Sequence, residues 1–184
     1  MRSKGSGKRM ERGLLQFYVG DGKGKTTAII GQVARTHGCG MKCAVYQFLK
    51  SVPSGETEAL RALGVPVERA EAESRKFFYQ MSATEKGAFL MRQRALYTRA
   101  VRAIRSGEYD LVALDEILDL IQIGGLDMDA LRMALTSRPQ HVEVLLSGRV
   151  MPRQLQDIAG YITEMRAVKH PFNDGVPARQ GIEY

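Results

Sequence analysis

Short apolar runs alternate with longer amphipathic segments along the chain of 184 residues. A short apolar run that ends at glycine or polar residues is typical of a buried strand, and apolar residues at helical spacing indicate a helix with one buried face. The predicted strands are 14–19, 44–49, 65–69, 111–114, 142–146 and 162–168. The predicted helices are 26–37, 56–63, 84–105, 127–136 and 153–159. Strands that alternate with helices predict a three-layer α/β domain with a mostly parallel central sheet.

The positive charge of the chain is concentrated at its start. Lysine and arginine number 27 against 20 acidic residues, which gives a formal net charge of +7. Residues 1–12 contribute +4 of this charge, so residues 13–184 carry only +3. We therefore interpret 1–12 as a flexible basic leader and 13–184 as one domain, with a partner-binding arm as the alternative for the leader. The bulk charge does not indicate nucleic-acid binding.

Other features of the composition narrow the cellular location and the class of protein. No run of about 18 apolar residues predicts a membrane span, and no secretory signal opens the chain. Cys39 and Cys43 are too few for a disulfide framework, so we expect a cytoplasmic protein. The helix 84–105 carries five arginines. No aromatic platform is interleaved with them, so we interpret this face as solvated surface rather than as a nucleic-acid stripe.

A segment rich in glycine and lysine follows the first predicted strand and opens the first predicted helix. Its residues are Gly20, Asp21, Gly22, Lys23, Gly24, Lys25, Thr26 and Thr27. At a strand–helix junction, glycines let backbone N–H groups curl around an anion, so we expect a phosphate-binding loop. Lys25 adds a cation for the phosphates, and the Thr26 hydroxyl is placed to bind Mg²⁺. The usual G-x-x-x-x-G-K-[ST] spacing puts a glycine at position 19, where this chain has Val19.

Two acidic residues, Asp115 and Glu116, close the apolar run 111–114. A carboxylate at the end of a neighbouring strand is expected to hold Mg²⁺ or a water bound to it. Because successive side chains on a strand point to opposite faces, at most one of the two points straight at the metal. An acidic pair that starts the following helix is the alternative. These motifs predict a nucleoside triphosphate with Mg²⁺ and leave an ATPase with Glu116 as base, a kinase and a group transferase open.

Further motifs extend along the rest of the chain. They are 47–50 (Gln-Phe-Leu-Lys), 114–117 (Leu-Asp-Glu-Ile), 147–149 (Ser-Gly-Arg), 163–165 (Thr-Glu-Met), 168–172 (Val-Lys-His-Pro-Phe), Gly175 and 181–184 (Gly-Ile-Glu-Tyr). Together with the loop 20–28, they resemble the ATP:corrinoid adenosyltransferases, which act on cobalamin and cob(I)yrinic acid a,c-diamide. The tail is the most specific part of the match. The resemblance implies a P-loop, RecA-like α/β fold.

The resemblance also implies a reaction in which a Co(I) corrinoid attacks the 5′ carbon of ATP and tripolyphosphate leaves. Because Co(I) is itself a strong nucleophile, the protein must align the reactants, neutralise the leaving group and exclude water. By position, the residues implied are Lys25 and Arg149 as catalytic cations, the loop 20–27 with Arg35 for ATP, and Thr26 with Glu116 or Asp115 for Mg²⁺. An ordinary surface charge is the alternative for Arg35 and for Arg149.

Two positions, Val19 and Ser51, depart from the family pattern. Some members of the family carry aromatic residues in a loop that expels the lower cobalt ligand. In the comparable region we expect Phe77 or Phe78 to cover the corrinoid, with core packing of the pair as the alternative.

The expected partners are ATP and a corrinoid, a second copy of the chain in a homodimer, and a reductase that supplies Co(I); no nucleic acid or membrane is expected. A RecA-like ATPase acting with nucleic acid, and a nucleotide- and corrinoid-binding module without turnover, are the rival functions.

Overall fold

A six-stranded sheet forms the centre of the protein, in the order β3-β2-β4-β5-β1-β6. The computed structural model describes residues 10–50, 54–71 and 76–183. The strands are β1 (Leu15–Val19), β2 (Cys43–Gln47), β3 (Val67–Arg69), β4 (Leu111–Asp115), β5 (Glu143–Ser147) and β6 (Tyr161–Glu164). All neighbouring strands are parallel. Their carboxyl ends therefore meet at one edge of the domain, where α/β sheets bind ligands.

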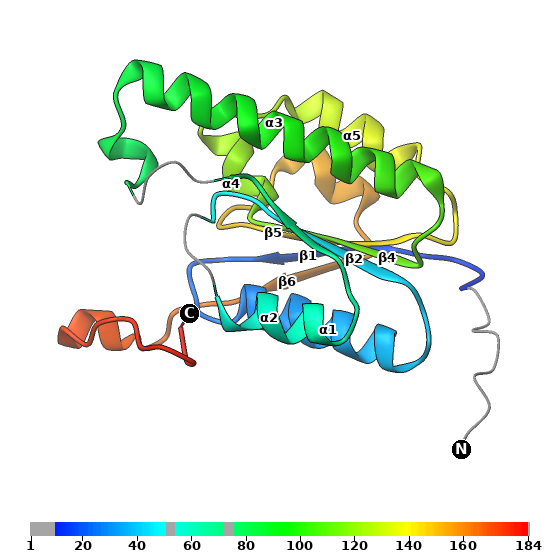
Figure 1. The fold of residues 1–184 in the computed structure, drawn as a ribbon, viewed down its shortest axis with the longest axis horizontal. Coiled ribbons are helices and arrows are strands. Elements are labelled where there is room, and N and C mark those ends of the chain that lie inside the picture. The colour runs from blue at the N-terminus through cyan, green and yellow to red at the C-terminus, as the bar shows by residue number, and fades with distance from the viewer. Residues whose placement is uncertain (1–9, 51–53, 72–75, 184) are drawn as a thin grey trace.

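Helices cover both faces of this sheet, with α1 and α2 on one face and α3, α4 and α5 on the other (Figure 1). The α-helices are α1 (Lys25–Gly38), α2 (Gly55–Ala62), α3 (Ala83–Ser106), α4 (Ile117–Gln122) and α5 (Met128–Thr136). Short 3-10 helices are η1 (Phe78–Gln80), η2 (Arg153–Ile158) and η3 (Pro171–Asp174). The predicted three-layer α/β architecture is confirmed, and the sheet is parallel between all of its paired strands.

Alternating side chains on the strands build one apolar core on each face of the sheet. In β4, Val112 and Leu114 belong to the core that packs under α3, α4 and α5. Leu111 and Ala113 belong to the core that packs under α1 and α2. Asp115 follows Leu111 and Ala113 at the same two-residue spacing, so its side chain is also directed toward α1.

The structure differs from the prediction at two predicted elements and adds one helix. Segment 153–159 is the 3-10 helix η2 rather than an α-helix, because Leu155 is its one buried residue and gives it no continuous apolar face. The last strand ends at Glu164 instead of residue 168, since the chain then turns to hydrogen-bond the loop after β1. Helix α4 was not predicted: its residues Ile117, Leu118 and Leu120 are all buried, so it shows no amphipathic period.

The longest helix, α3, has a capping motif at each end. Ser82 and Glu85 form a reciprocal capping box at its start, and Gly107 ends it with a positive φ of 63°. Arginines of this helix contact other elements: the Nε of Arg94 donates to the carbonyl of Gly125, and Arg99 pairs with Glu68. These arginines therefore help to position the loops and strands beside α3.

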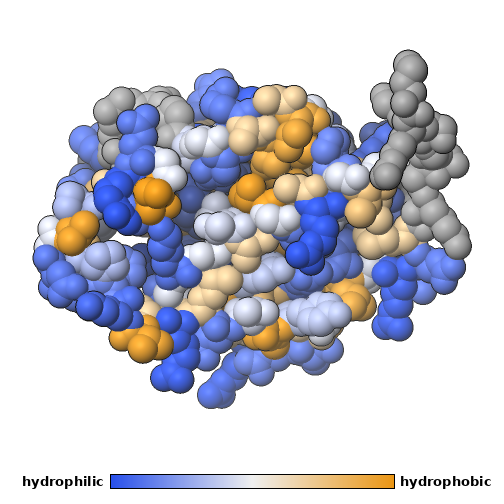
Figure 2. All heavy atoms as spheres, turned by 90° about the horizontal axis from the view of Figure 1, so that it is seen from below, coloured by the Kyte–Doolittle hydropathy of each residue, from blue (hydrophilic) through white to orange (hydrophobic). Residues whose placement is uncertain are grey.

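Residues 1–9 of the predicted leader lie outside the described residues. In the described part of the chain, no helix is long and apolar enough to cross a membrane. A view onto the face that carries α1 and α2 shows small apolar groups separated by hydrophilic side chains (Figure 2).

Two glycine substitutions test the packing of these layers. A Cβ at Gly148 would lie 2.5 Å from the Cβ of Leu118. Gly148→Ala should therefore push α4 away from β5 and lower the free energy of unfolding by about 1–3 kcal/mol. A Cβ at Gly87, within α3, would meet nothing within 4 Å, so Gly87→Ala should raise this free energy by about 0.5–1 kcal/mol. Urea unfolding measures both variants, and equal effects would contradict the close packing of α4.

Candidate functional site

Three neighbouring strands end in buried polar residues. Gln47, Asp115 and Ser147 are the last residues of β2, β4 and β5. The residues two positions before them belong to the core under α1 and α2, so all three side chains lie on the face of the sheet that these helices cover. We call these three residues the polar row.

The loop between β1 and α1 contains two glycines with positive φ. Gly20 and Gly24 have φ angles of 106° and 115°, which side chains with a Cβ rarely adopt. A Cβ at Gly20 would also lie 2.3 Å from the carbonyl oxygen of Met165. Val19 remains the last residue of β1, paired with Glu164, so the turn begins at Gly20 and the glycine usual at position 19 is not required.

Some amides of this loop are already used within the protein. The N–H groups of Gly20 and Gly22 donate to the carbonyls of Arg149 and Met165, at 2.9 and 2.7 Å. The carboxylate of Asp21 accepts from the N–H of Ala167. A phosphate would therefore depend on the amides from Lys23 onward, including those of the first turn of α1, which have no partner within the helix.

The ammonium of Lys25 lies in the mouth of the loop. Its Nζ donates to the carbonyls of Gly20 and Gly22, at 2.6 and 2.8 Å. Burial lowers the pKa of Lys25, with Asp119 opposing this shift and Arg149 adding to it. The side chain is thus held where an anion bound to the loop would meet it.

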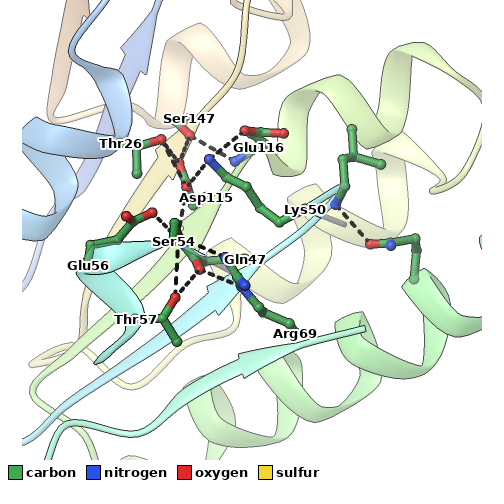
Figure 3. A network of polar contacts seen from close by, with 12 residues as sticks. Thr26, Gln47, Lys50, Ser54, Glu56, Thr57, Arg69, Asp115, Glu116 and Ser147 are labelled. Atoms are coloured by element: carbon green, nitrogen blue, oxygen red, sulfur yellow. Dashed lines mark hydrogen bonds and ion pairs between the residues drawn. The ribbon is translucent and has the colours of Figure 1, made fainter. Parts of the chain in front are cut away.

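Asp115 connects the polar row to the start of α1 (Figure 3). Its carboxylate is fully buried and accepts hydrogen bonds from the hydroxyls of Thr26, at 3.0–3.1 Å, and Ser147, at 2.7 Å. The Thr26–Asp115 oxygen separation is close to the edge of an octahedron whose metal–oxygen bonds are about 2.0–2.1 Å. Hard oxygen donors at this spacing fit Mg²⁺.

Glu116 directly precedes α4 and has a positive φ of 62°. Its N–H donates to the Ser147 hydroxyl at 2.8 Å, and its carboxylate pairs with the Nζ of Lys50 at 3.0 Å. Burial raises the pKa of Glu116 more than the charge of Lys50 lowers it. The residue therefore both starts a helix and presents a carboxylate beside Asp115.

No group of three or more His, Cys, Asp or Glu within the described ranges could form an all-protein metal cage. Mg²⁺ sites usually rely on one or two carboxylates together with substrate phosphates.

The amide of Gln47 links Asp115 to α2 and β3 (Figure 3). Its oxygen accepts from the hydroxyl of Thr57 at 3.2 Å and from the Nε of Arg69 at 2.9 Å. Its nitrogen donates to Glu56 at 3.2 Å and approaches Asp115 at 3.5 Å. This network fixes the orientation of the amide, so the nitrogen side faces the buried carboxylate.

The C-terminal tail lies against the phosphate loop. The Nζ of Lys23 donates to the carbonyl of Ile182 and to the carboxylate of Glu183, both at 3.0 Å. The tail, one side of α1 and the start of α2 line an open cavity of about 510 Å³, and its lining includes Thr26, Lys50 and Ile182. The cavity opens directly beside the Thr26–Asp115 contact.

The two arginines expected near the nucleotide differ in position. Arg149 follows β5; its carbonyl accepts from Gly20, its N–H donates to Asp119, and it lines a second hollow of about 350 Å³ beside the loop. Arg35 lies in the last turn of α1, exposed, and is not among the residues that line either cavity. The structure thus brings Arg149 to the loop and leaves Arg35 farther along the helix.

The aromatic residues before α3 also differ from each other. Phe78 packs on Phe89 with a centroid distance of 5.7 Å, and the Nζ of Lys86 lies over its ring. Phe77 is 65% exposed and stacks with Tyr79, which is 74% exposed. Figure 1 shows this segment at the end of the molecule that carries the phosphate loop. Ser51, the second departure from the family pattern, lies outside the described residues.

Sequence reasoning missed several residues of the site as functional positions. Gln47, Lys50 and Ser147 were noted only as parts of motifs, and Thr57 and Arg69 were not considered. The two-residue period of β2, β4 and β5 could have found Gln47 and Ser147, since both follow the same side of their strands as Asp115.

Comparison with known proteins agrees with this geometry. The model of the family ATP:corrinoid adenosyltransferase BtuR/CobO/CobP matches residues 11–184. Corrinoid adenosyltransferase CobA of Salmonella typhimurium (strain LT2) is 34% identical over 175 residues, which cover 95% of this chain and 87% of that protein. The corrinoid adenosyltransferase of Escherichia coli (strain K12) is 33% identical, with the same coverage of both chains. The corrinoid adenosyltransferase of Pseudomonas aeruginosa is 30% identical over 96% of this chain and 86% of its own length.

The family match spans nearly the whole sequence and includes the phosphate loop, the polar row and the tail that lies against the loop. This chain therefore belongs to the ATP:corrinoid adenosyltransferase family and is an enzyme of the transferase class.

Proposed function

We propose that the enzyme transfers the 5′-deoxyadenosyl group of ATP to the Co(I) centre of a corrinoid, either cobalamin or cob(I)yrinic acid a,c-diamide, and releases tripolyphosphate. The observation that carries this proposal is the Thr26–Asp115 contact beside Lys25, at the mouth of a cavity, in a chain of this family. In the reaction the Co–C5′ bond forms with the electron pair of Co(I). The C5′–O bond breaks and tripolyphosphate keeps its electron pair.

The site offers more binding groups to the triphosphate than to any other part of ATP. Lys25 and the amides from Lys23 to Thr27 would bind its oxygens, and Arg149 would add a second cation beside the loop. Thr26 with Asp115 and Glu116 would hold Mg²⁺, which neutralises charge on phosphate oxygens. Such charge compensation stabilises the leaving group as the C5′–O bond breaks.

This reaction needs no side-chain base, because the nucleophile is the cobalt of the substrate. The remaining tasks are to hold the 5′ carbon in line with the cobalt and to exclude water. The open cavity between α1, α2 and the tail would hold the nucleotide, with Ile182 as an apolar wall. For the corrinoid face we favour Phe77 over Phe78, since the ring of Phe78 is already packed on α3.

The proposed setting is a cytoplasmic homodimer that works with a reductase supplying Co(I). A RecA-like ATPase acting with nucleic acid is the second candidate, and the raised pKa of Glu116 favours it, because a base must accept a proton. The ion pair of Glu116 with Lys50 opposes this role. It stabilises the charged carboxylate, whereas a base must take up a proton.

An anaerobic assay tests the reaction. Protein, Mg·ATP and chemically reduced cob(I)alamin are mixed, and the loss of the Co(I) absorption band and the formation of a light-sensitive adenosyl product are followed. Lys25→Ala should lower the rate by at least about a hundredfold, because it removes the cation from the phosphate loop. Lys42 is an exposed lysine directly before β2, so Lys42→Ala is the matched control and should retain activity. Absence of product with the unaltered enzyme would refute the transferase proposal.

Paired substitutions test which carboxylate matters more for Mg²⁺. Asp115→Asn should raise the Mg²⁺ concentration for half-maximal activity by about tenfold or more, because this carboxylate contacts Thr26 directly. Glu116→Gln should have the smaller effect, since its carboxylate contacts Lys50 instead. The reverse order would assign the direct role to Glu116.

The aromatic segment gives a further contrast. Phe77→Ala should weaken corrinoid binding by about fivefold or more, because an exposed ring supplies apolar and stacking contact area. Phe78→Ala should instead lower thermal stability, since its ring packs on Phe89. Corrinoid affinity from absorbance titration and melting curves separate the two. An unchanged affinity in Phe77→Ala would remove Phe77 from the corrinoid site.

A further inference from the structure

The backbone at the end of β2 is built to direct Lys50 back over the sheet edge. Leu49 has a positive φ of 57°, which is strained for a leucine. Its N–H donates to the amide oxygen of Gln93, a buried residue of α3, and the preceding N–H, from Phe48, donates to the carbonyl of Asp115. These two bonds hold the strained turn, and the next side chain in the sequence is Lys50.

The ammonium of Lys50 lies between the two acidic residues of the site (Figure 3). Its Nζ is 3.0 Å from the Oε1 of Glu116 and 3.7 Å from the Oδ2 of Asp115. The same Oδ2 accepts from the Thr26 hydroxyl at 3.0 Å. The lysine therefore shares with Thr26 the carboxylate that fits Mg²⁺.

The charge of Lys50 opposes the binding of a second cation to the same carboxylate oxygens. The buried carboxylate of Asp115 and the half-buried carboxylate of Glu116 lie side by side and need a compensating cation, and Lys50 supplies one within the protein. A divalent cation bound to the same oxygens would lie close to the ammonium, and the two positive charges would repel each other. The two cations therefore compete for Asp115 and Glu116.

The side chain of Lys50 has a place to which it can move. It retains 23% exposure and lines the cavity beside Thr26. Glu56 lines the same cavity, but its carboxylate already accepts from Gln47. A lysine has a flexible stem of four carbons, so its ammonium can leave the carboxylates without any change in the backbone.

We propose that Lys50 is a mobile counter-ion, which neutralises Asp115 and Glu116 in the nucleotide-free enzyme, releases them to a divalent cation, and then binds the triphosphate in the cavity. The inference rests on the proposed function, because it assumes that a triphosphate binds beside Thr26. One lysine thus stabilises the empty site and afterwards adds positive charge to the leaving group.

Lys50→Met tests this role, because methionine keeps much of the length of the side chain and removes its charge. Mn²⁺ binding to nucleotide-free protein, measured by electron paramagnetic resonance, should become tighter by about tenfold, since the competing ammonium is gone. Binding of tripolyphosphate with Mg²⁺, measured by calorimetry, should become weaker by about fivefold or more. Lys50→Arg keeps the charge and should retain the weak Mn²⁺ binding of the unaltered protein, and Lys42→Met should change neither quantity.

A purely structural lysine would change only the melting temperature. Unchanged Mn²⁺ affinity or unchanged tripolyphosphate affinity in Lys50→Met would overturn the proposal. Should Lys50→Met not fold, Lys50→Gln provides the same two measurements with an uncharged polar side chain. If the unaltered protein binds Mn²⁺ but forms no adenosyl-corrinoid, the proposed function fails, while the competition between Lys50 and Mn²⁺ is still measured.

Discussion

The buried carboxylate of Asp115 is the group around which this site is arranged. A fully buried charge is unfavourable unless hydrogen bonds and a counter-charge surround it. Here Ser147 and Thr26 donate to it, and Lys50 lies nearby. Because these three residues come from β5, α1 and the end of β2, one carboxylate ties three separate parts of the fold together.

The same arrangement positions the phosphate loop. Thr26 is held to the sheet by Asp115, while the loop itself is held by backbone hydrogen bonds to Arg149 and Met165. The loop therefore has its shape through contacts with segments that follow β5 and β6. Its remaining amides and the ammonium of Lys25 are left to meet an anion, which agrees with the proposed role of the site in compensating the charge of a triphosphate.

Much of this could be predicted from the sequence. The strand–loop–helix order predicted the phosphate loop, and the polar residues after apolar strands predicted the edge of the sheet that carries the site. The two-residue period of β4 places Asp115 with Leu111 and Ala113, toward α1, whereas the family resemblance favoured Glu116 as the partner of Thr26. Both carboxylates lie at the site, but Asp115 makes the direct contact with Thr26.

Other features depend on contacts between segments far apart in the chain. The tail contact between Lys23 and Glu183 spans 160 residues, and no local pattern indicates it. The strained backbone of Leu49 is stabilised by Gln93 on α3, so neither residue alone predicts where Lys50 points. The same holds for Phe77 and Phe78, which only their packing distinguishes.

We propose that this site uses the triphosphate as a leaving group rather than as a source of a single phosphate. ³¹P nuclear magnetic resonance of the products distinguishes the two uses. With Mg·ATP and cob(I)alamin under anaerobic conditions, we expect tripolyphosphate in the same amount as adenosyl-corrinoid, and none when the corrinoid is omitted. ADP and inorganic phosphate formed at the same rate with and without corrinoid would contradict it.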